Sequence, residues 1–192
     1  MQQHPNTLRI IGGKWRSRKI NFAPLKGVRP TTDASRETLF NWLTPAINDA
    51  NCLDLFAGSG ALGFEALSRG AKHVVMVDAS MQIISTLKKT AHLLHTEDIE
   101  LYCAKIPQRI NKIPQQTFDI VFLDPPFYCD LIKPTCEKLA TSSYLAKNTI
   151  IYIEAEKEID IEDIIPKSWQ ILRQKIVGQV GNYLLANFPT IN

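Results

Sequence analysis

Long hydrophobic runs are absent from this 192-residue chain, and cysteine is scarce. The longest apolar runs, Ile120–Leu123 and Ile150–Ile153 among them, are far too short to cross a bilayer. The first seven residues are polar and no apolar stretch follows them, which argues against a secretory signal. The four cysteines show no CxxC spacing and are expected to be reduced thiols, as in cytosolic proteins. We therefore expect a soluble, cytoplasmic protein that forms one domain with a short extension.

Positive charge is concentrated at the start of the chain. The net charge is +3, yet residues 1–36 hold eight basic side chains and one acidic side chain, so this segment carries +7 and the rest −4. Lysine and arginine neutralise phosphates, so such an arm favours a polyanionic partner. A merely solvated tail is the alternative, but it would not need the interspersed Leu8, Ile10 and Trp15. The candidates for binding this partner are Arg9, Lys14, Arg16, Arg18, Lys19, Arg29 and Arg36.

The apolar pattern predicts a small basic hairpin ahead of the main domain. Leu8–Ile11 and Arg18–Phe22 are expected to be two short strands joined across a glycine-containing turn. Asp33 is expected to cap a helix that begins at Ala34, because apolar residues then recur every fourth position along one face. We therefore divide the chain into a hairpin and connection over residues 1–33 and a main domain over residues 34–192.

From residue 51 onward, short apolar strands alternate with helical stretches. Strands are expected at Cys52–Phe56, His73–Val77, Ile99–Cys103, Phe118–Leu123 and Thr149–Ile153, with helices at Ala61–Ser68, 83–94 and 128–140. This alternation predicts a doubly wound α/β fold with a parallel sheet. Trp169–Val177 and Val180–Phe188 are separated by only two residues, which leaves no room for a crossover helix. The mostly parallel sheet should therefore end in an antiparallel hairpin.

A glycine-rich turn follows the first strand of this domain. Residues 54–63 hold a GxGxxG string between strand and helix, where main-chain N–H groups can meet a ligand, and Asp78 ends the next strand. A turn that only packs helix on sheet is the structural alternative. NAD and S-adenosylmethionine both suit the pattern, but Asp54 is placed for a cationic amino group and the chain is short for an NAD enzyme. The candidate cofactor-binding residues are Asp54, Phe56, Ala57, Gly58, Ser59, Gly60, Asp78 and Ala79.

An Asp-Pro-Pro-Phe tetrad follows the fourth of these strands, where open α/β sheets place their chemistry. The Asp124 carboxylate and the Pro125 carbonyl can accept hydrogen bonds from both N–H groups of an exocyclic NH₂ and point its lone pair at an electrophile. Phe127 can stack on the base that carries the amine. The alternative is an ordinary Asp-Pro turn. The candidate catalytic residues are Asp124, Pro125, Pro126 and Phe127.

These segments resemble a known family. The tetrad and the Asp54–Gly60 turn are similar to those of class I S-adenosylmethionine-dependent methyltransferases that modify exocyclic amines. Residues 9–16, 29–33, 36–43 and 55–63 and the turn at 178–180 resemble the ribosomal small-subunit methyltransferase D family, over nearly the whole chain. The resemblance implies a Rossmann-like class I fold, S-adenosyl-L-methionine as cofactor, and N2-methylation of guanine 966 in 16S ribosomal RNA. It also implies that the basic arm helps to hold RNA in the small subunit or an assembly intermediate.

Two other functions fit parts of the pattern. An adenine-N6 methyltransferase acting on DNA would share the chemistry, although the chain has no separate DNA-recognition domain. A non-catalytic RNA-binding assembly factor is the second alternative, against which the intact glycine turn and tetrad argue. One position departs from the family, which often has Asp or Asn after its third strand to bind adenine. Here Lys105 stands instead and offers no acceptor. No metal is expected, and nothing suggests an obligate dimer, so a monomer is expected.

Overall fold

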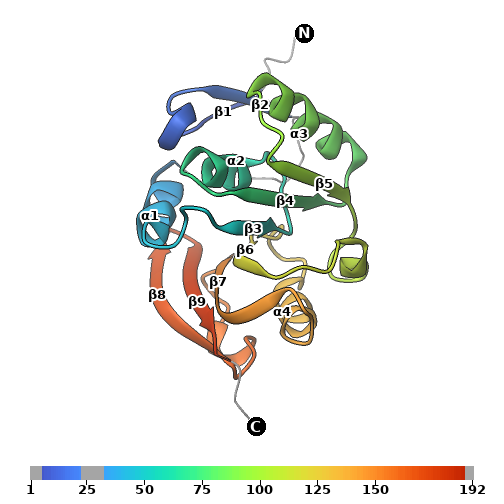
Figure 1. Ribbon diagram of the computed structural model, residues 1–192. Coiled ribbons are helices and arrows are strands. Elements are labelled where there is room, and N and C mark those ends of the chain that lie inside the picture. Colours follow the sequence, from blue (N-terminus) through green and yellow to red (C-terminus); the bar gives the residue numbers. More distant parts are fainter. Residues whose placement is uncertain (1–5, 23–32, 189–192) are drawn as a thin grey trace.

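A seven-stranded sheet forms the centre of the protein (Figure 1) in the computed structural model, which describes residues 6–22 and 33–188. The strands are parallel except β9, which runs antiparallel to both of its neighbours. This confirms a Rossmann-like α/β sheet that ends in an antiparallel hairpin. In sheet order the strands are β5 (Ile99–Cys103), β4 (His73–Asp78), β3 (Asn51–Asp54), β6 (Phe118–Leu123), β7 (Leu145–Glu156), β9 (Val180–Asn187) and β8 (Trp169–Val177).

Helices cover both faces of the sheet because alternate side chains of each strand point to opposite sides. Cys52 of β3 belongs to the buried cluster that includes side chains of α1 (Asp33–Leu43), α2 (Ala61–Ser68) and α3 (Met81–Leu93). Its neighbour Leu53 belongs to the cluster on the other face, which includes α4 (Ile132–Ala140). No helix in the described residues is long and apolar enough to span a membrane.

The first turns of the helices are explained by local sequence, and the start of α1 differs from the expectation. The side chain of Ser80 accepts a hydrogen bond from Ile83 N–H and caps α3. Pro134 lies in the first turn of α4, where a missing N–H costs nothing, so it does not kink the helix. Asp33, expected as a cap, is instead the first residue of α1 and forms an ion pair with Arg36 at 2.6 Å.

The basic hairpin packs on the helical layer rather than extending into solvent (Figure 1). Strands β1 (Asn6–Arg9) and β2 (Lys19–Phe22) pair antiparallel, and a 3₁₀ turn over Gly13–Trp15 lies between them. Leu8, Ile10, Trp15 and Ile20 are buried in the same cluster as the side chains of α2 and α3. For these residues the solvated-tail alternative is therefore wrong. Arg29 lies outside the described residues.

Candidate active site

A cavity of about 540 Å³ lies at the carboxyl ends of the central strands. Strand β3 pairs with β4 on one side and β6 on the other, and their helical connections diverge there. Open α/β sheets bind ligands at such a reversal of strand order. Eleven of the twelve expected catalytic and cofactor-binding residues line this cavity: Asp54, Phe56, Ala57, Gly58, Ser59, Asp78, Ala79, Asp124, Pro125, Pro126 and Phe127.

The turn after β3 is held by hydrogen bonds to β4. Ala57 N–H donates to a β4 carbonyl at 2.9 Å, and Gly58 N–H donates to Oδ2 of Asp78 at 3.1 Å. Gly60, the twelfth expected residue, does not line the cavity. Its φ is +79°, and a Cβ atom there would come within 2.6 Å of the Phe64 ring. Glycine is therefore required at this position by the turn and by the packing of α2.

Asp54 lies at the end of β3 with its carboxyl group buried, and the residue is 1% exposed. Burial, followed by the nearby charge of Asp124, raises the pKa of Asp54 from 3.8 to about 8. Within the described parts of the chain, no group forms a hydrogen bond with its Oδ1 atom. A buried carboxyl oxygen without a partner is costly, so this position suits a ligand that brings a cation.

Asp78 ends β4 on the next side of the cavity. Its two oxygens accept hydrogen bonds from backbone N–H groups of Gly58 and Ser80, at 3.1 and 2.8 Å. Burial nevertheless raises the pKa of this carboxyl group above 3.8, since desolvation outweighs these bonds. Each oxygen has a second lone pair, so the oriented carboxylate can accept further hydrogen bonds from ligand hydroxyls.

The tetrad follows β6 and forms the adjoining wall. Pro125 is buried, Phe127 is half-buried, and both line the cavity together with Asp124. Two consecutive prolines fix φ and present no N–H donor, so this stretch offers acceptors to a ligand. The backbone N–H of the next residue, Tyr128, donates to the Glu156 carboxylate at the end of β7. The loop is thereby fixed to the neighbouring strand.

The wall also includes residues that were not expected from the sequence. The Val177–Val180 turn lines the cavity because antiparallel pairing places Val180 beside the last residue of β7. Glu154, one residue beyond the strand expected at Thr149–Ile153, is buried there and accepts a hydrogen bond from the Tyr152 hydroxyl at 3.1 Å. Ser35 of α1 also lines the cavity. The strand register, which the sequence does not show, brings Glu154 and the Val177–Val180 turn to the cavity, and the packing of α1 brings Ser35 there.

Five of the seven expected basic residues lie on the surface of the hairpin: Arg9, Lys14, Arg16, Arg18 and Lys19 are all exposed. The expectation for Arg36 is wrong, because its side chain is fully buried and cannot reach a macromolecular surface. Its guanidinium group forms ion pairs with Asp33 at 2.6 Å and Glu65 at 3.6 Å, and donates to the Arg9 carbonyl at 2.9 Å. Arg36 thus contributes to the fold of the arm.

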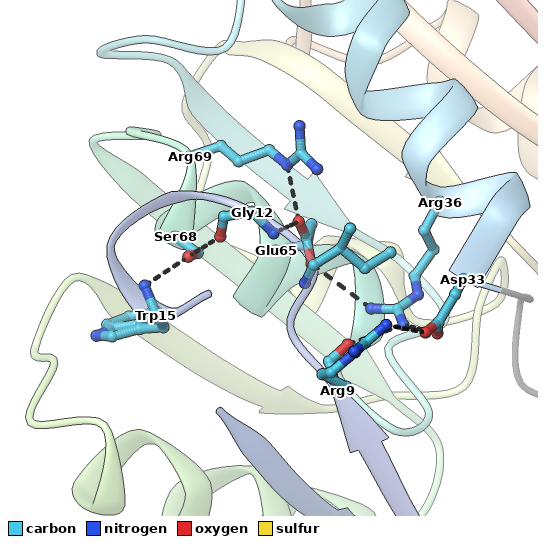
Figure 2. Close-up of polar contacts among 9 residues, drawn as sticks. Arg9, Gly12, Trp15, Asp33, Arg36, Glu65, Ser68 and Arg69 are labelled. Carbon is cyan, nitrogen blue, oxygen red and sulfur yellow. Dashed lines mark hydrogen bonds and ion pairs between the residues drawn. The ribbon is translucent and has the colours of Figure 1, made fainter. Parts of the chain in front are cut away.

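The buried carboxylate of Glu65 joins the arm to α2, as Figure 2 shows. It accepts hydrogen bonds from the backbone N–H groups of Ile11 and Gly12, both at 2.8 Å, and from Nε of Arg69 at 2.7 Å. One turn further on, Ser68 accepts from Trp15 N–H at 2.9 Å. A charge in an otherwise buried helix was the sequence signal for this contact. The arm therefore has a fixed place on the domain.

Comparisons with known proteins agree over nearly the full length. The family model described as conserved hypothetical protein 95 matches residues 8–186. Ribosomal RNA small subunit methyltransferase D of Haemophilus influenzae is 42% identical over 196 residues, which cover 96% of this chain and 98% of that protein. Its Escherichia coli (strain K12) counterpart is 41% identical over 174 residues, covering 91% and 87%.

Solved structures show the same correspondence. An Escherichia coli protein described as a methyltransferase has 40% identity and a TM-score of 0.85, and the match covers 96% of this chain and 100% of that one. A T. thermophilus 16S rRNA N2 G1207 methyltransferase, solved with AdoMet and guanosine, has a TM-score of 0.71 over 97% of this chain and 50% of that one. At 19% identity this second likeness concerns the fold alone. The full-length matches at about 40% identity show that the chain belongs to the ribosomal RNA small subunit methyltransferase D family.

Proposed function

We propose that this protein transfers a methyl group from S-adenosyl-L-methionine to the exocyclic N2 of guanine 966 in 16S ribosomal RNA of the small subunit. One observation carries the proposal. The Asp124–Phe127 tetrad lies in the same cavity as Asp54, Asp78 and the glycine turn, so an amine-binding set faces a nucleoside-binding set. The name shared by the curated relatives supports small-subunit ribosomal RNA as the substrate.

The residues of the cavity fit S-adenosyl-L-methionine. Four acidic residues line it, Asp54, Asp78, Asp124 and Glu154, and this cofactor carries both a sulfonium and an ammonium cation. The Oδ1 atom of Asp54 has no hydrogen-bond partner among the described residues, and it would accept a hydrogen bond from the ammonium group. Asp78 would accept from the ribose hydroxyls. When bound, the cofactor supplies the electrophilic methyl group.

The tetrad would prepare the amine. An exocyclic amine of guanine is a weak nucleophile because its lone pair is conjugated with the ring. Asp124 and the Pro125 carbonyl would accept hydrogen bonds from its two N–H groups, which directs the nitrogen lone pair out of conjugation. The nitrogen loses one of these protons as it gains the methyl group, and the Asp124 carboxylate would accept that proton. Phe127 would stack on the base once it has been turned out of the RNA. The protein's contribution in this scheme is positioning and polarisation, without a metal or a covalent intermediate.

The basic hairpin would supply the RNA contacts outside the cavity. Arg9, Lys14, Arg16, Arg18 and Lys19 are exposed on one rigidly placed extension, and each can neutralise a phosphate. Residues 1–33 would thus be an RNA-binding extension of the methyltransferase domain over residues 34–192. We propose that the enzyme acts as a monomer in the cytoplasm, on the small subunit or on an assembly intermediate.

Methyl transfer from labelled S-adenosyl-L-methionine tests this function. The substrates are small subunits lacking the modification, free 16S RNA and duplex DNA, and the product nucleoside is identified by mass spectrometry. N2-methylguanosine at one position of the subunit is expected. An Asp124→Ala variant, which removes the acceptor, should lose the product, whereas Asp98→Ala, which removes an exposed carboxylate at the other end of the sheet, should retain it. N6-methyladenine in DNA, or a different nucleoside in the subunit, would contradict the proposal.

A further inference from the structure

Tyr128, which directly follows the tetrad, has an unusual conformation for an aromatic residue. Its φ is +58°, in the left-handed region that L-residues with bulky side chains rarely adopt. The residue is 80% exposed, so this conformation is not compensated by burial of the side chain. A glycine or an asparagine would satisfy the same turn with less strain.

The conformation is maintained by Glu156. This residue is buried at the end of β7, and its carboxylate accepts the backbone N–H of Tyr128. The bond fixes the Tyr128 backbone on the strand next to β6, so the ring projects from a rigid support. The strain is thus imposed by a specific buried acceptor and is not a feature of a loose loop.

The position of the ring relative to Phe127 suggests what it does. The two ring centroids are 6.3 Å apart and the planes are nearly perpendicular, at 87°. Phe127 lines the cavity, whereas Tyr128 does not and is exposed outside it. Phe127 therefore lines the candidate base pocket, and the exposed ring of Tyr128 is available to a group that binds next to that pocket.

We propose that Tyr128 stacks on the nucleotide adjacent to the target guanine, an inference that rests on the proposed function. A base turned out of a strand leaves its neighbour without a stacking partner. An exposed aromatic ring beside the pocket replaces that partner, and stacking tolerates any base because every base has a π face. Tyr128 is in this scheme an RNA-contacting residue, and Glu156 is the positioning residue that holds it.

Substitutions at Tyr128 test the stacking directly. The readouts are KM and kcat with small subunits lacking the modification, the Kd for the subunit from filter binding, and the Kd for S-adenosyl-L-methionine from calorimetry. Tyr128→Ala and Tyr128→Leu should each raise the KM and the Kd for the subunit by about tenfold. Tyr128→Phe and Tyr128→Trp should stay near the wild type, and cofactor affinity should be unchanged in all four.

Two further variants separate the ring from its support. Glu156→Gln keeps an acceptor oxygen and should behave as the wild type, whereas Glu156→Ala should weaken subunit binding as Tyr128→Ala does. Phe188→Ala is the matched control, because this aromatic is also partly exposed but follows the far end of β9. If Glu156→Ala does not fold, the Tyr128 variants still decide the matter, since an exposed ring is not needed for folding.

Three results would overturn the inference. Wild-type subunit affinity in Tyr128→Ala would show that the ring touches no RNA. Wild-type affinity in Tyr128→Leu would indicate an apolar contact, for example with a ribosomal protein. A loss confined to kcat would place the effect in the tetrad. Failure of the proposed function is distinguishable, because it is the wild-type protein that would then transfer no methyl group to the subunit.

Discussion

Replacing Asp54 by asparagine should stabilise the cofactor-free protein while weakening cofactor binding. In the free protein, burial raises the pKa of this carboxyl group from 3.8 to about 8. The folded state therefore binds more protons than the unfolded state between these two pH values. A raised folded-state pKa gives stability that is complete below pH 4 and is lost as the pH rises towards 8. Asparagine does not titrate, so the variant should not show this loss.

The size of the effect follows from the shift. Each pKa unit is worth 1.36 kcal/mol, so the buried carboxyl group costs on the order of 4 kcal/mol at pH 7. The asparagine amide retains a burial penalty of about 1–3 kcal/mol, which leaves a net gain of about 2 kcal/mol. In a chain of 192 residues this corresponds to a Tm higher by about 4–8 °C.

Thermal unfolding of both proteins from pH 4 to pH 8, without cofactor, measures this difference. The Tm of Asp54→Asn minus that of the wild type should be smallest at pH 4 and should grow towards pH 8. Asp98→Asn, at an exposed carboxylate, should show no such trend. A difference that does not change with pH, or a variant less stable than the wild type at pH 8, would refute the reasoning.

Cofactor binding should change the protonation of Asp54. An ammonium group binds the ionised carboxylate, so S-adenosyl-L-methionine should release most of one proton from Asp54 at pH 7, and affinity should rise by up to about tenfold from pH 6 to pH 7. Calorimetry in two buffers of different ionisation enthalpy counts the protons. Asp54→Asn should bind weakly and release none. Equal proton release by both proteins would show that Asp54 does not meet the cation.

Further substitutions address the tetrad, the arm and the RNA surface in turn. Asp124→Ala should leave the calorimetric affinity for S-adenosyl-L-methionine nearly unchanged while turnover falls by about 100-fold or more. Glu65→Ala leaves the fully buried Arg36 without this partner, so urea unfolding should show a loss of about 3–5 kcal/mol, with a smaller loss in Glu65→Gln. The double change Arg16→Ala and Arg18→Ala should reduce the slope of log affinity for the subunit against log salt by about 1.5, which filter binding at several salt concentrations would reveal.

The sheet and the cavity were largely predictable because they depend on local sequence. Buried parallel strands require apolar runs, and the runs at His73–Val77, Ile99–Cys103 and Phe118–Leu123 mark β4, β5 and β6 closely. Because parallel strands run in the same direction, the residues that follow them lie at one edge of the sheet. Asp54, Asp78 and Asp124 could therefore be grouped before any contact between them was known.

What the sequence could not show depends on partners distant along the chain. Arg36 looked like part of the charged arm, and its contacts with Glu65, Asp33 and the Arg9 carbonyl explain its burial. The ends of β7 were missed for a similar reason. Glu154 and Glu156 are polar and would normally end a strand, but β9 pairs alongside them and both are buried. The pairing of β7 with β9 has no signature in the local pattern, and the charge of Glu65 in a buried helix does not show which residue it pairs with.

Helix α2 connects the two sites that the proposed reaction requires. Its first residue follows the glycine turn of the cavity, and its Glu65 and Ser68 bind the basic arm (Figure 2). Eight residues of helix span only about 12 Å, so the two attachments are close. A second connection runs through α1, where Ser35 lines the cavity and the adjacent Arg36 pairs with Glu65. We therefore expect displacement of the arm to disturb the cofactor site, so Glu65→Ala should weaken cofactor and RNA binding together.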